Sequence, residues 1–440
     1  MSGILELPNL SSTPRNEEFE ELVSAFFNSA GYYVEKNIID REITEIEVLE
    51  LDVITTEYIS PDTSPTIRLV EVKSGNWGFP DIFKIRGWMD YLNIDEGLFI
   101  VQEEKEETEF KFFKEKASKL NVSIKTFEEL KTQEDGSIID DNDIIFWRYT
   151  YWLERNLLKE LRRRKRSQKD RKCYKVLNDY YHTVNNKIFF TETITQRLYE
   201  LYNTFMECPH ISARCGYEEY NGDFEDHTKV PGKIYEDSFF RCMFTDIQIS
   251  TYIEHRARLA ILKNAVDYIL YEKVGEEDKT KDVSLVLVDD REVTLWDCLP
   301  DRFKDRLEKI SKHKYFYRYP IFWQWFMWVF GGFILKDYEK KEYELLSQKT
   351  GIPPDEIPKA LEAYQILFPS EGGWIKDLQD SNSNVKIITM FPVPFMGIGA
   401  NYRRYIYTDS KKFEDLKLSG EHTLGDLIKW NNLACKVLNS

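Results

Sequence analysis

The first regular pattern in the chain is helical. In the stretch NEEFEELVSAFFNSAGYY, apolar side chains recur at the three- and four-residue spacing of one helix face, acidic residues occupy the first turn, and Gly31 follows the end. Acidic side chains near a helix start are stabilised by the helix dipole. The pattern predicts one amphipathic helix from about Glu17 to Ser29.

Four short segments rich in β-branched and aromatic residues follow, and they alternate as strands do. In the second segment Asp52 has apolar neighbours on both sides, and in the third Glu71 and Lys73 alternate with valines. Helical patterns separate the later segments, so the order predicts an α/β domain with a central mixed sheet flanked by helices. The four segments are residues 32–39, 45–58, 66–74 and 97–104.

Beyond the acidic stretch QEDGSIIDDND, at 133–143, the pattern changes to long helical periods with few strand signals. This stretch is the best domain boundary, and we expect domains at residues 1–140, 141–335 and 336–440. The second should be mainly helical and the third α+β. Within the second, VSLVLVDDREVTLWDCL predicts a hairpin with Asp289 and Asp290 at its turn.

The third domain begins with a predicted helix, turn and helix over Glu342–Leu367, and NVKIITMFPV and RRYIYTD follow as predicted strands. This order would suit a winged helix-turn-helix. The second helix is net acidic and has only Lys359 as a base, which favours a structural or protein-contact role over reading of the major groove.

The aromatic run IFWQWFMWVFGGFIL, Ile321 to Leu335, is shorter than the ~20 residues that a spanning helix needs. We expect a buried helix there. The aromatic cluster at 315–328 could stack bases, but helical spacing favours core packing.

The net charge of -16 is unevenly distributed. Residues 1–147 hold 32 acidic and 14 basic side chains, a balance of -18, whereas the remainder holds 44 and 46, a balance of +2. An acidic surface repels phosphate backbones. Any contact with nucleic acid must therefore come from local basic patches, from bound metal, or from the C-terminal part.

The six cysteines are scattered, and the N-terminus has no signal-peptide pattern. Reduced thiols and a cytoplasmic location are expected, with no membrane association.

Asp52, Glu71 and Lys73 form the candidate catalytic site. Carboxylates on one charged face of adjacent strands repel one another unless a cation neutralises them, and hard oxygen ligands select Mg²⁺ or Mn²⁺. Such a metal polarises a scissile phosphate and lowers the pKa of a bound water, while Lys73 positions or deprotonates that water. The expected chemistry is phosphodiester hydrolysis.

The segments FEELVSAFFNSAGYYVEKN, ELDVI and LVEVKSG together resemble the restriction endonuclease-like core of the PD-(D/E)XK nuclease superfamily, most closely the Mrr-type enzymes. The resemblance covers roughly residues 16–130. It implies that Asp52 and Glu71 are metal ligands, with Lys73 completing the motif.

The same resemblance places the helix acid on Glu20, although Glu17, Glu18 and Glu21 crowd it and any of them could serve only the helix dipole. Leu51 stands where the motif has proline.

Asp62 is the rival to Asp52, since Pro61-Asp62 matches the motif as text. Asp62 lies in SPDTSP, between two prolines, where aspartate is typical of turns. A turn at a hairpin tip is far from the centre of the next strand, so strand alternation selects Asp52.

Two further signals lie in the C-terminal part. The basic stretch RRRKRSQKDRK could contact phosphates or form a solvated helix end. Two cysteines and two histidines could bind zinc, but their spacing lacks CxxC pairs and favours ordinary buried thiols. The nucleic-acid candidates are Arg162, Arg163, Arg164, Lys165 and Arg166, and the zinc candidates are Cys208, His210, Cys215 and His227.

Together these features predict a Mg²⁺- or Mn²⁺-dependent nuclease, with DNA favoured over RNA as its substrate. The layout resembles effectors of prokaryotic restriction or antiphage defence, with a C-terminal part that recognises a trigger, a protein partner, another copy or DNA. The alternatives are a catalytically inactive nuclease-fold scaffold and a winged-helix DNA-binding regulator. The choice between DNA and RNA, the sequence specificity, the oligomeric state and what the C-terminal part senses stay open.

Overall fold

A computed structural model gives the fold. It describes residues 8, 10–41, 47–133, 139–167, 194–203, 246–274, 285–288, 291–370, 372–377, 385–389, 391–407, 414–419 and 422–438.

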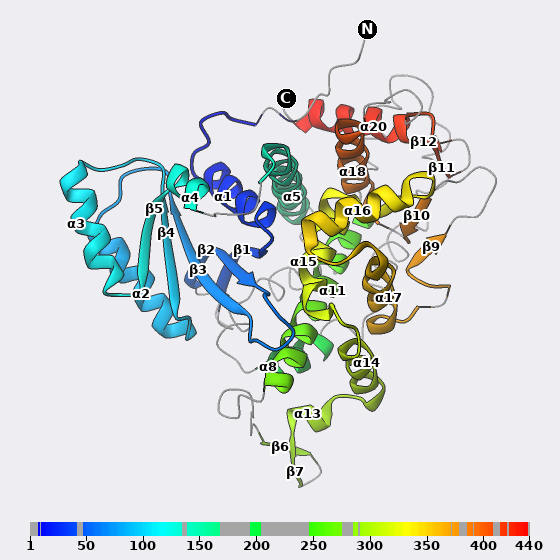
Figure 1. Cartoon of the computed structure of the whole chain (residues 1–440), viewed down its shortest axis with the longest axis horizontal. Coiled ribbons are helices and arrows are strands. Elements are labelled where there is room, and N and C mark those ends of the chain that lie inside the picture. Colours follow the sequence, from blue (N-terminus) through cyan, green and yellow to red (C-terminus); the bar gives the residue numbers. More distant parts are fainter. Residues whose placement is uncertain are drawn as a thin grey trace.

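The N-terminal part is built on a five-stranded mixed sheet whose strands lie in sequence order, β1 to β5 (Figure 1). β1, β2 and β3 are antiparallel neighbours, whereas β3, β4 and β5 are parallel. Parallel neighbours need crossover connections, and α2 and α3 supply them. The four predicted strands are confirmed. The elements are β1 (Tyr33–Arg41), β2 (Glu47–Glu57), β3 (Thr66–Lys73), α2 (Phe79–Leu92), β4 (Glu96–Val101), α3 (Glu107–Ser118) and β5 (Val122–Thr126).

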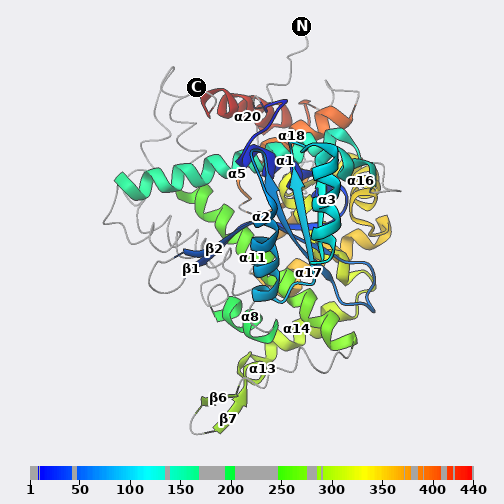
Figure 2. The same ribbon diagram turned by 90° about the vertical axis from the view of Figure 1, so that its left-hand side faces the viewer.

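Helices cover both faces of this sheet. α1 (Glu17–Ser29), at the predicted bounds, lies on the side of the sheet that meets the rest of the molecule, and α2 and α3 lie in front of the strands in Figure 2. The apolar side chains of β3 divide accordingly. Val70 and Val72 pack in one cluster with Phe26 of α1, whereas Leu69 packs with Ile82 of α2.

The helical part joins the sheet through α1. The long helix α5 (Asp141–Ser167) packs against α1, and one apolar cluster continues from there to the C-terminal helices. The core therefore runs on across residues 140 and 335, where the domain boundaries were expected. The other helices of this region are α4 (Phe127–Gln133), α8 (Ile194–Leu201), α11 (Asp246–Val274), α13 (Leu295–Cys298), α14 (Asp301–Ser311) and α15 (Tyr319–Gln324).

The aromatic run at 321–335 is buried, as predicted, but it is not one helix. α15 passes into a π-helical turn (Trp325–Val329), and Gly331 and Gly332, both with φ of 70°, turn the chain into β8 (Phe333–Leu335). A Cβ at Gly331 would lie 2.7 Å from the carbonyl oxygen of Phe395, so the close approach of another segment excludes a side chain here.

The C-terminal part contains a three-stranded antiparallel sheet of order β8-β10-β9. The predicted helix pair is present between β8 and β9 in the chain, and the strand predicted from NVKIITMFPV is confirmed as β10. The elements are α16 (Glu339–Thr350), α17 (Ile357–Leu367), β9 (Ile375–Asp377) and β10 (Val385–Ile388).

The strand predicted from RRYIYTD is wrong, because α18 (Val393–Ile406) includes its first four residues. Arg403 in this helix is buried and donates hydrogen bonds to the carbonyl oxygens of Phe330 (2.7 Å) and Gly399 (3.1 Å). It also forms an ion pair with the buried Glu342. These long-range partners outweigh the strand preference of the aromatic and β-branched residues around it.

The remaining described elements are two strand pairs, three 3-10 turns and the helix α20. The predicted hairpin is confirmed as the pair β6 (Leu285–Val288) and β7 (Arg291–Thr294), with its turn outside the described residues. In the described ranges, no helix is both long and apolar enough to cross a membrane. The last elements are 3-10 turns at Phe316–Arg318, Lys336–Tyr338 and Pro354–Glu356, with β11 (Lys417–Ser419), β12 (His422–Thr423) and α20 (Leu424–Leu438).

Candidate active site

Asp52 lies where β2 and β3 stop pairing. The register of the two strands runs from Glu57 opposite Thr66 to Val53 opposite Val70. One step further, Oδ2 of Asp52 accepts a hydrogen bond of 2.9 Å from the backbone N–H of Val72. The side chain of Asp52 thus reaches across to β3, where the charges of Glu71 and Lys73 act on its pKa.

Glu71 is the buried centre of the site, with 2% of its side chain exposed. Its Oε1 lies 3.3 Å from Nζ of Lys73 and also 3.3 Å from Nζ of Lys84 on α2. Its Oε2 is buried and has no hydrogen-bond partner among the described residues. A carboxylate oxygen left in this condition is costly unless a donor or a cation reaches it.

Glu20 is the acid that α1 turns toward this centre. Burial raises its pKa, Lys36 lowers it, and the charges of Glu17, Glu50 and Glu71 raise it further. The start of α1 is tied to the end of β3, because the backbone N–H of Asn16 donates to Oγ of Ser74 at 2.8 Å. This tie fixes Glu20 relative to the strand that carries the other site residues.

The neighbouring acids on α1 have a different partner, Arg155 of α5. Glu21 contacts its Nε at 2.8 Å, and Glu17 and Glu18 each lie 3.8 Å from its terminal nitrogens. Among the crowded acids, the geometry therefore favours Glu20 as the residue of the site.

The electrostatic strain of the site is evident at Asp52. Burial raises the pKa of Asp52 well above its ordinary value, and the charges of Glu71 and Glu20 raise it further, against the Val72 hydrogen bond and Lys73. Burial acts to lower the pKa of Lys73, but Glu71 and Asp52 raise it, and the net shift is upward. Lys73 is therefore a cation at neutral pH, which suits charge stabilisation better than proton abstraction.

The donor set fits a hard divalent cation at Asp52 and Glu71. The buried, unpartnered Oε2 of Glu71 and the upward shift of Asp52 are both relieved by a nearby positive charge. Asp52 and Glu71 would hold the ion, with water and substrate oxygens completing its shell. No cluster of three or more His, Cys, Asp or Glu side chains suited to a metal occurs in the described part of the chain.

Asp62 lies in the turn between β2 and β3, as predicted. Its side chain is exposed, and its backbone N–H donates to Oγ of Ser60 at 3.2 Å. The charges that act on Asp52 are those of Glu71, Glu20 and Lys73, and Asp62 is not among them.

The structure describes the other predicted sites only in part. α5 includes positions 162–166, but their side chains lie outside the described set, as do all four zinc candidates at 208–227. On α17, Lys359 pairs with Glu356, and most apolar side chains are buried. The aromatic cluster around Trp323 and Trp325 is core.

Lys84 is the site residue that sequence reasoning missed. α2 was predicted from its apolar spacing, and Lys84 falls on its polar side, where a solvated lysine is ordinary. Only its distance from Glu71, 13 positions earlier in the chain, separates it from other surface lysines.

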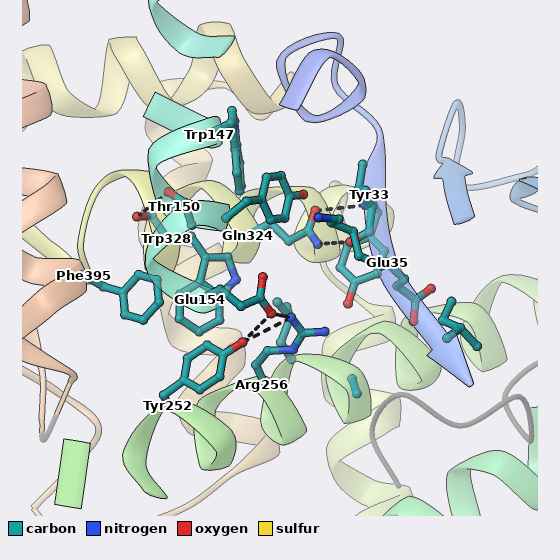
Figure 3. A pocket seen from close by; sticks show the side chains of 16 residues that line it. Tyr33, Glu35, Trp147, Thr150, Glu154, Tyr252, Arg256, Gln324, Trp328 and Phe395 are labelled. Atoms are coloured by element: carbon teal, nitrogen blue, oxygen red, sulfur yellow. Dashed lines mark hydrogen bonds and ion pairs between the residues drawn. The ribbon is translucent and has the colours of Figure 1, made fainter. Parts of the chain in front are cut away.

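A second polar cluster lies where the edge strand β1 meets the helices (Figure 3). The side-chain amide of Gln324 donates to the carbonyl oxygen of Val34 (2.7 Å) and accepts from its N–H (3.2 Å), as a neighbouring strand would. Nearby, Glu154 of α5 pairs with Arg256 and accepts from Tyr252 of α11. These groups satisfy one another, so the cluster joins the sheet to the helical part.

Comparisons of the chain with protein-family models, with curated proteins and with solved structures found no match. The assignment of a function therefore depends on the geometry of the site itself.

Proposed function

We propose that the protein is a metal-dependent nuclease that hydrolyses phosphodiester bonds in nucleic acid. The observation that carries the proposal is the convergence of Asp52 from β2 with Glu71 and Lys73 from β3 at the point where the two strands separate. Strained, buried carboxylates beside a protonated lysine are typical of a site that stabilises added charge.

The fold is consistent with a restriction endonuclease-like core. A mixed sheet with an antiparallel β1-β2-β3 unit and parallel β3-β4-β5 crossovers carries the acids on its central strands, and α1 supplies a further acid. We propose this fold family and, from the same resemblance, DNA as the substrate and restriction or antiphage defence in the cytoplasm as the setting.

The residues have distinct tasks in this proposal. A divalent cation bound at Asp52 and Glu71 would activate a water and polarise the scissile phosphate. Lys73, held 3.3 Å from Glu71, presents a fixed positive charge to the developing phosphorane. Glu20 adds negative charge that increases the affinity of the site for a cation.

The C-terminal sheet supports a winged-helix module. Its strand order, β8-β10-β9, with α16 and α17 between β8 and β9, is the topology expected for that motif. α17 buries most of its apolar residues and exposes Glu362, so we propose protein contact rather than major-groove reading for this module.

An inactive scaffold is the second candidate. It is favoured by one observation, that two lysines, Lys73 and Lys84, already supply positive charge to Glu71. The hydrogen bond from Val72 gives Asp52 a structural task as well.

A cleavage assay separates the two candidates. Purified full-length protein with Mn²⁺ is incubated with plasmid, single-stranded DNA and RNA, and Lys73→Ala serves as the matched control. The nuclease proposal predicts cleavage of plasmid that falls about 10²- to 10³-fold in the variant, the usual loss for one transition-state contact. Absence of cleavage of all three substrates would support the scaffold.

A further inference from the structure

A second lysine shares the carboxylate of Glu71. Nζ of Lys84 and Nζ of Lys73 each lie 3.3 Å from the same oxygen, Oε1. One lysine is enough to neutralise one carboxylate, so the second positive charge is in excess over what Glu71 alone needs. The side chain of Lys84 is also the more exposed, at 45% against 33% for Lys73.

The aromatic ring of Trp88 holds Lys84 in place. The two residues are four positions apart on α2, and Nζ of Lys84 lies 4.0 Å from the ring centroid of Trp88. Residues at this spacing share one helix face, and a cation over an indole ring is favoured. The ammonium group is thus oriented toward the buried acid and still open to solvent.

We propose that Lys84, supported by Trp88, forms a phosphate-binding position for the nucleic-acid substrate. The inference rests on the proposed nuclease function and adds a residue to the same site. When a cation occupies Asp52 and Glu71, Lys84 gives up Oε1 of Glu71 and binds a non-bridging oxygen of a phosphate next to the scissile bond. In a part of the chain with a balance of -18, such a local cation is what a phosphate backbone requires.

Removal of Lys84 should change the affinity for metal and the affinity for substrate in opposite directions. Lys84 competes with a metal for Glu71, so its removal should strengthen metal binding. Because Lys84 is partly exposed, its pair with Glu71 is screened, and the gain should be about twofold to fivefold. Loss of one phosphate contact should weaken binding of the substrate and reduce its salt dependence. Removal of a lysine with only a structural role would not strengthen metal binding and weaken substrate binding at the same time.

The test uses full-length protein and two binding measurements. Calorimetry gives the affinity for Mn²⁺ alone. Fluorescence anisotropy with a labelled DNA oligonucleotide, in Ca²⁺ to suppress cleavage, gives the substrate affinity at several salt concentrations. The variants are Lys84→Ala, Lys84→Arg, Trp88→Leu, and Lys105→Ala as the control, because Lys105 contacts Trp77 and Glu109 instead of the site.

We expect Lys84→Ala to bind Mn²⁺ about twofold to fivefold more tightly and DNA about tenfold more weakly, with a salt slope smaller by about 0.7–0.9. Lys84→Arg should keep the salt slope, Trp88→Leu should weaken only DNA binding, and Lys105→Ala should match the wild type. Unchanged affinities in Lys84→Ala, or weaker binding of both ligands, would overturn the inference and leave the nuclease function standing. A wild type that binds neither Mn²⁺ nor DNA would overturn both.

Discussion

The carboxylate of Asp52 accepts a hydrogen bond of 2.9 Å from the backbone N–H of Val72, at the point where β2 and β3 cease to pair. The side chain of Asp52 replaces a strand partner, and its carboxylate lies close enough to Glu71 for the charge of Glu71 to raise its pKa. Asp52 therefore marks the end of the β2–β3 pairing and also contributes a carboxylate to the candidate site. An ionised Asp52 at this buried position costs free energy of folding, and this cost leads to the first prediction.

Asp52→Asn should stabilise the metal-free protein at neutral pH. A raised pKa means that the native state holds its proton more tightly than the unfolded chain. The contribution of Asp52 to the free energy of unfolding is thus complete below its ordinary value of 3.8 and is lost as pH rises through the native pKa. Asparagine can still accept from Val72, so the gain above that pKa should be about 1–3 kcal/mol.

Chemical denaturation of both proteins from pH 4 to pH 8 measures this difference. Mn²⁺ should raise the stability of the wild type and leave the variant unchanged. Equal stabilities at every pH would show that Asp52 carries no electrostatic strain.

Glu20→Gln should reduce cleavage about 10- to 100-fold, the range for a residue that supports a metal site without dominating it. Glu17→Gln is the matched control, since Glu17 is 64% exposed and lies 3.8 Å from Arg155. Its cleavage rate should stay near that of the wild type. Equal rates for the two variants would remove Glu20 from the site.

Glu21→Gln should change how stability depends on pH. Burial raises the pKa of Glu21 to about 7, although Lys36 and Arg155 oppose the shift. The contribution of Glu21 is complete below its ordinary value of 4.5 and is lost as pH rises through about 7, on the order of 3 kcal/mol. Urea unfolding should give similar stabilities at pH 4.5 and a more stable variant at pH 8. Parallel curves would contradict the shift.

Arg403→Met should destabilise the protein by about 3–5 kcal/mol, because it leaves the buried Glu342 without its cation. The double variant Arg403→Met/Glu342→Leu should recover part of that loss, as replacement of both partners removes the buried charge. It will not recover all of it, since Glu342 also accepts from the N–H of Leu335 at 2.9 Å. A fully additive double-mutant cycle would show that the two side chains do not interact.

The sheet and most of the site could be predicted because they depend on local patterns. Strand alternation placed Asp52, Glu71 and Lys73, and turn chemistry excluded Asp62. Lys84 could not be found in this way, because a lysine on the polar side of a helix has no local signature.

For the segment RRYIYTD, the local pattern was present but predicted the wrong structure, a strand instead of a helix. Its aromatic and β-branched residues have strand preference, but Arg403 binds groups some 60 to 70 residues away in the chain, and these contacts fix a helix. The glycines at 331 and 332 end the aromatic helix for a similar reason, since a Cβ at Gly331 would meet the backbone of α18 and one at Gly332 would meet the ring of Phe391.

The most direct test of the nuclease site is Mn²⁺-dependent cleavage by two matched variants, Asp52→Asn and Asp62→Asn. Both remove one carboxylate from the same hairpin, but only Asp52 lies beside Glu71. We predict that Asp52→Asn loses cleavage while Asp62→Asn cleaves nearly as the wild type does. Active Asp52→Asn with inactive Asp62→Asn would contradict it.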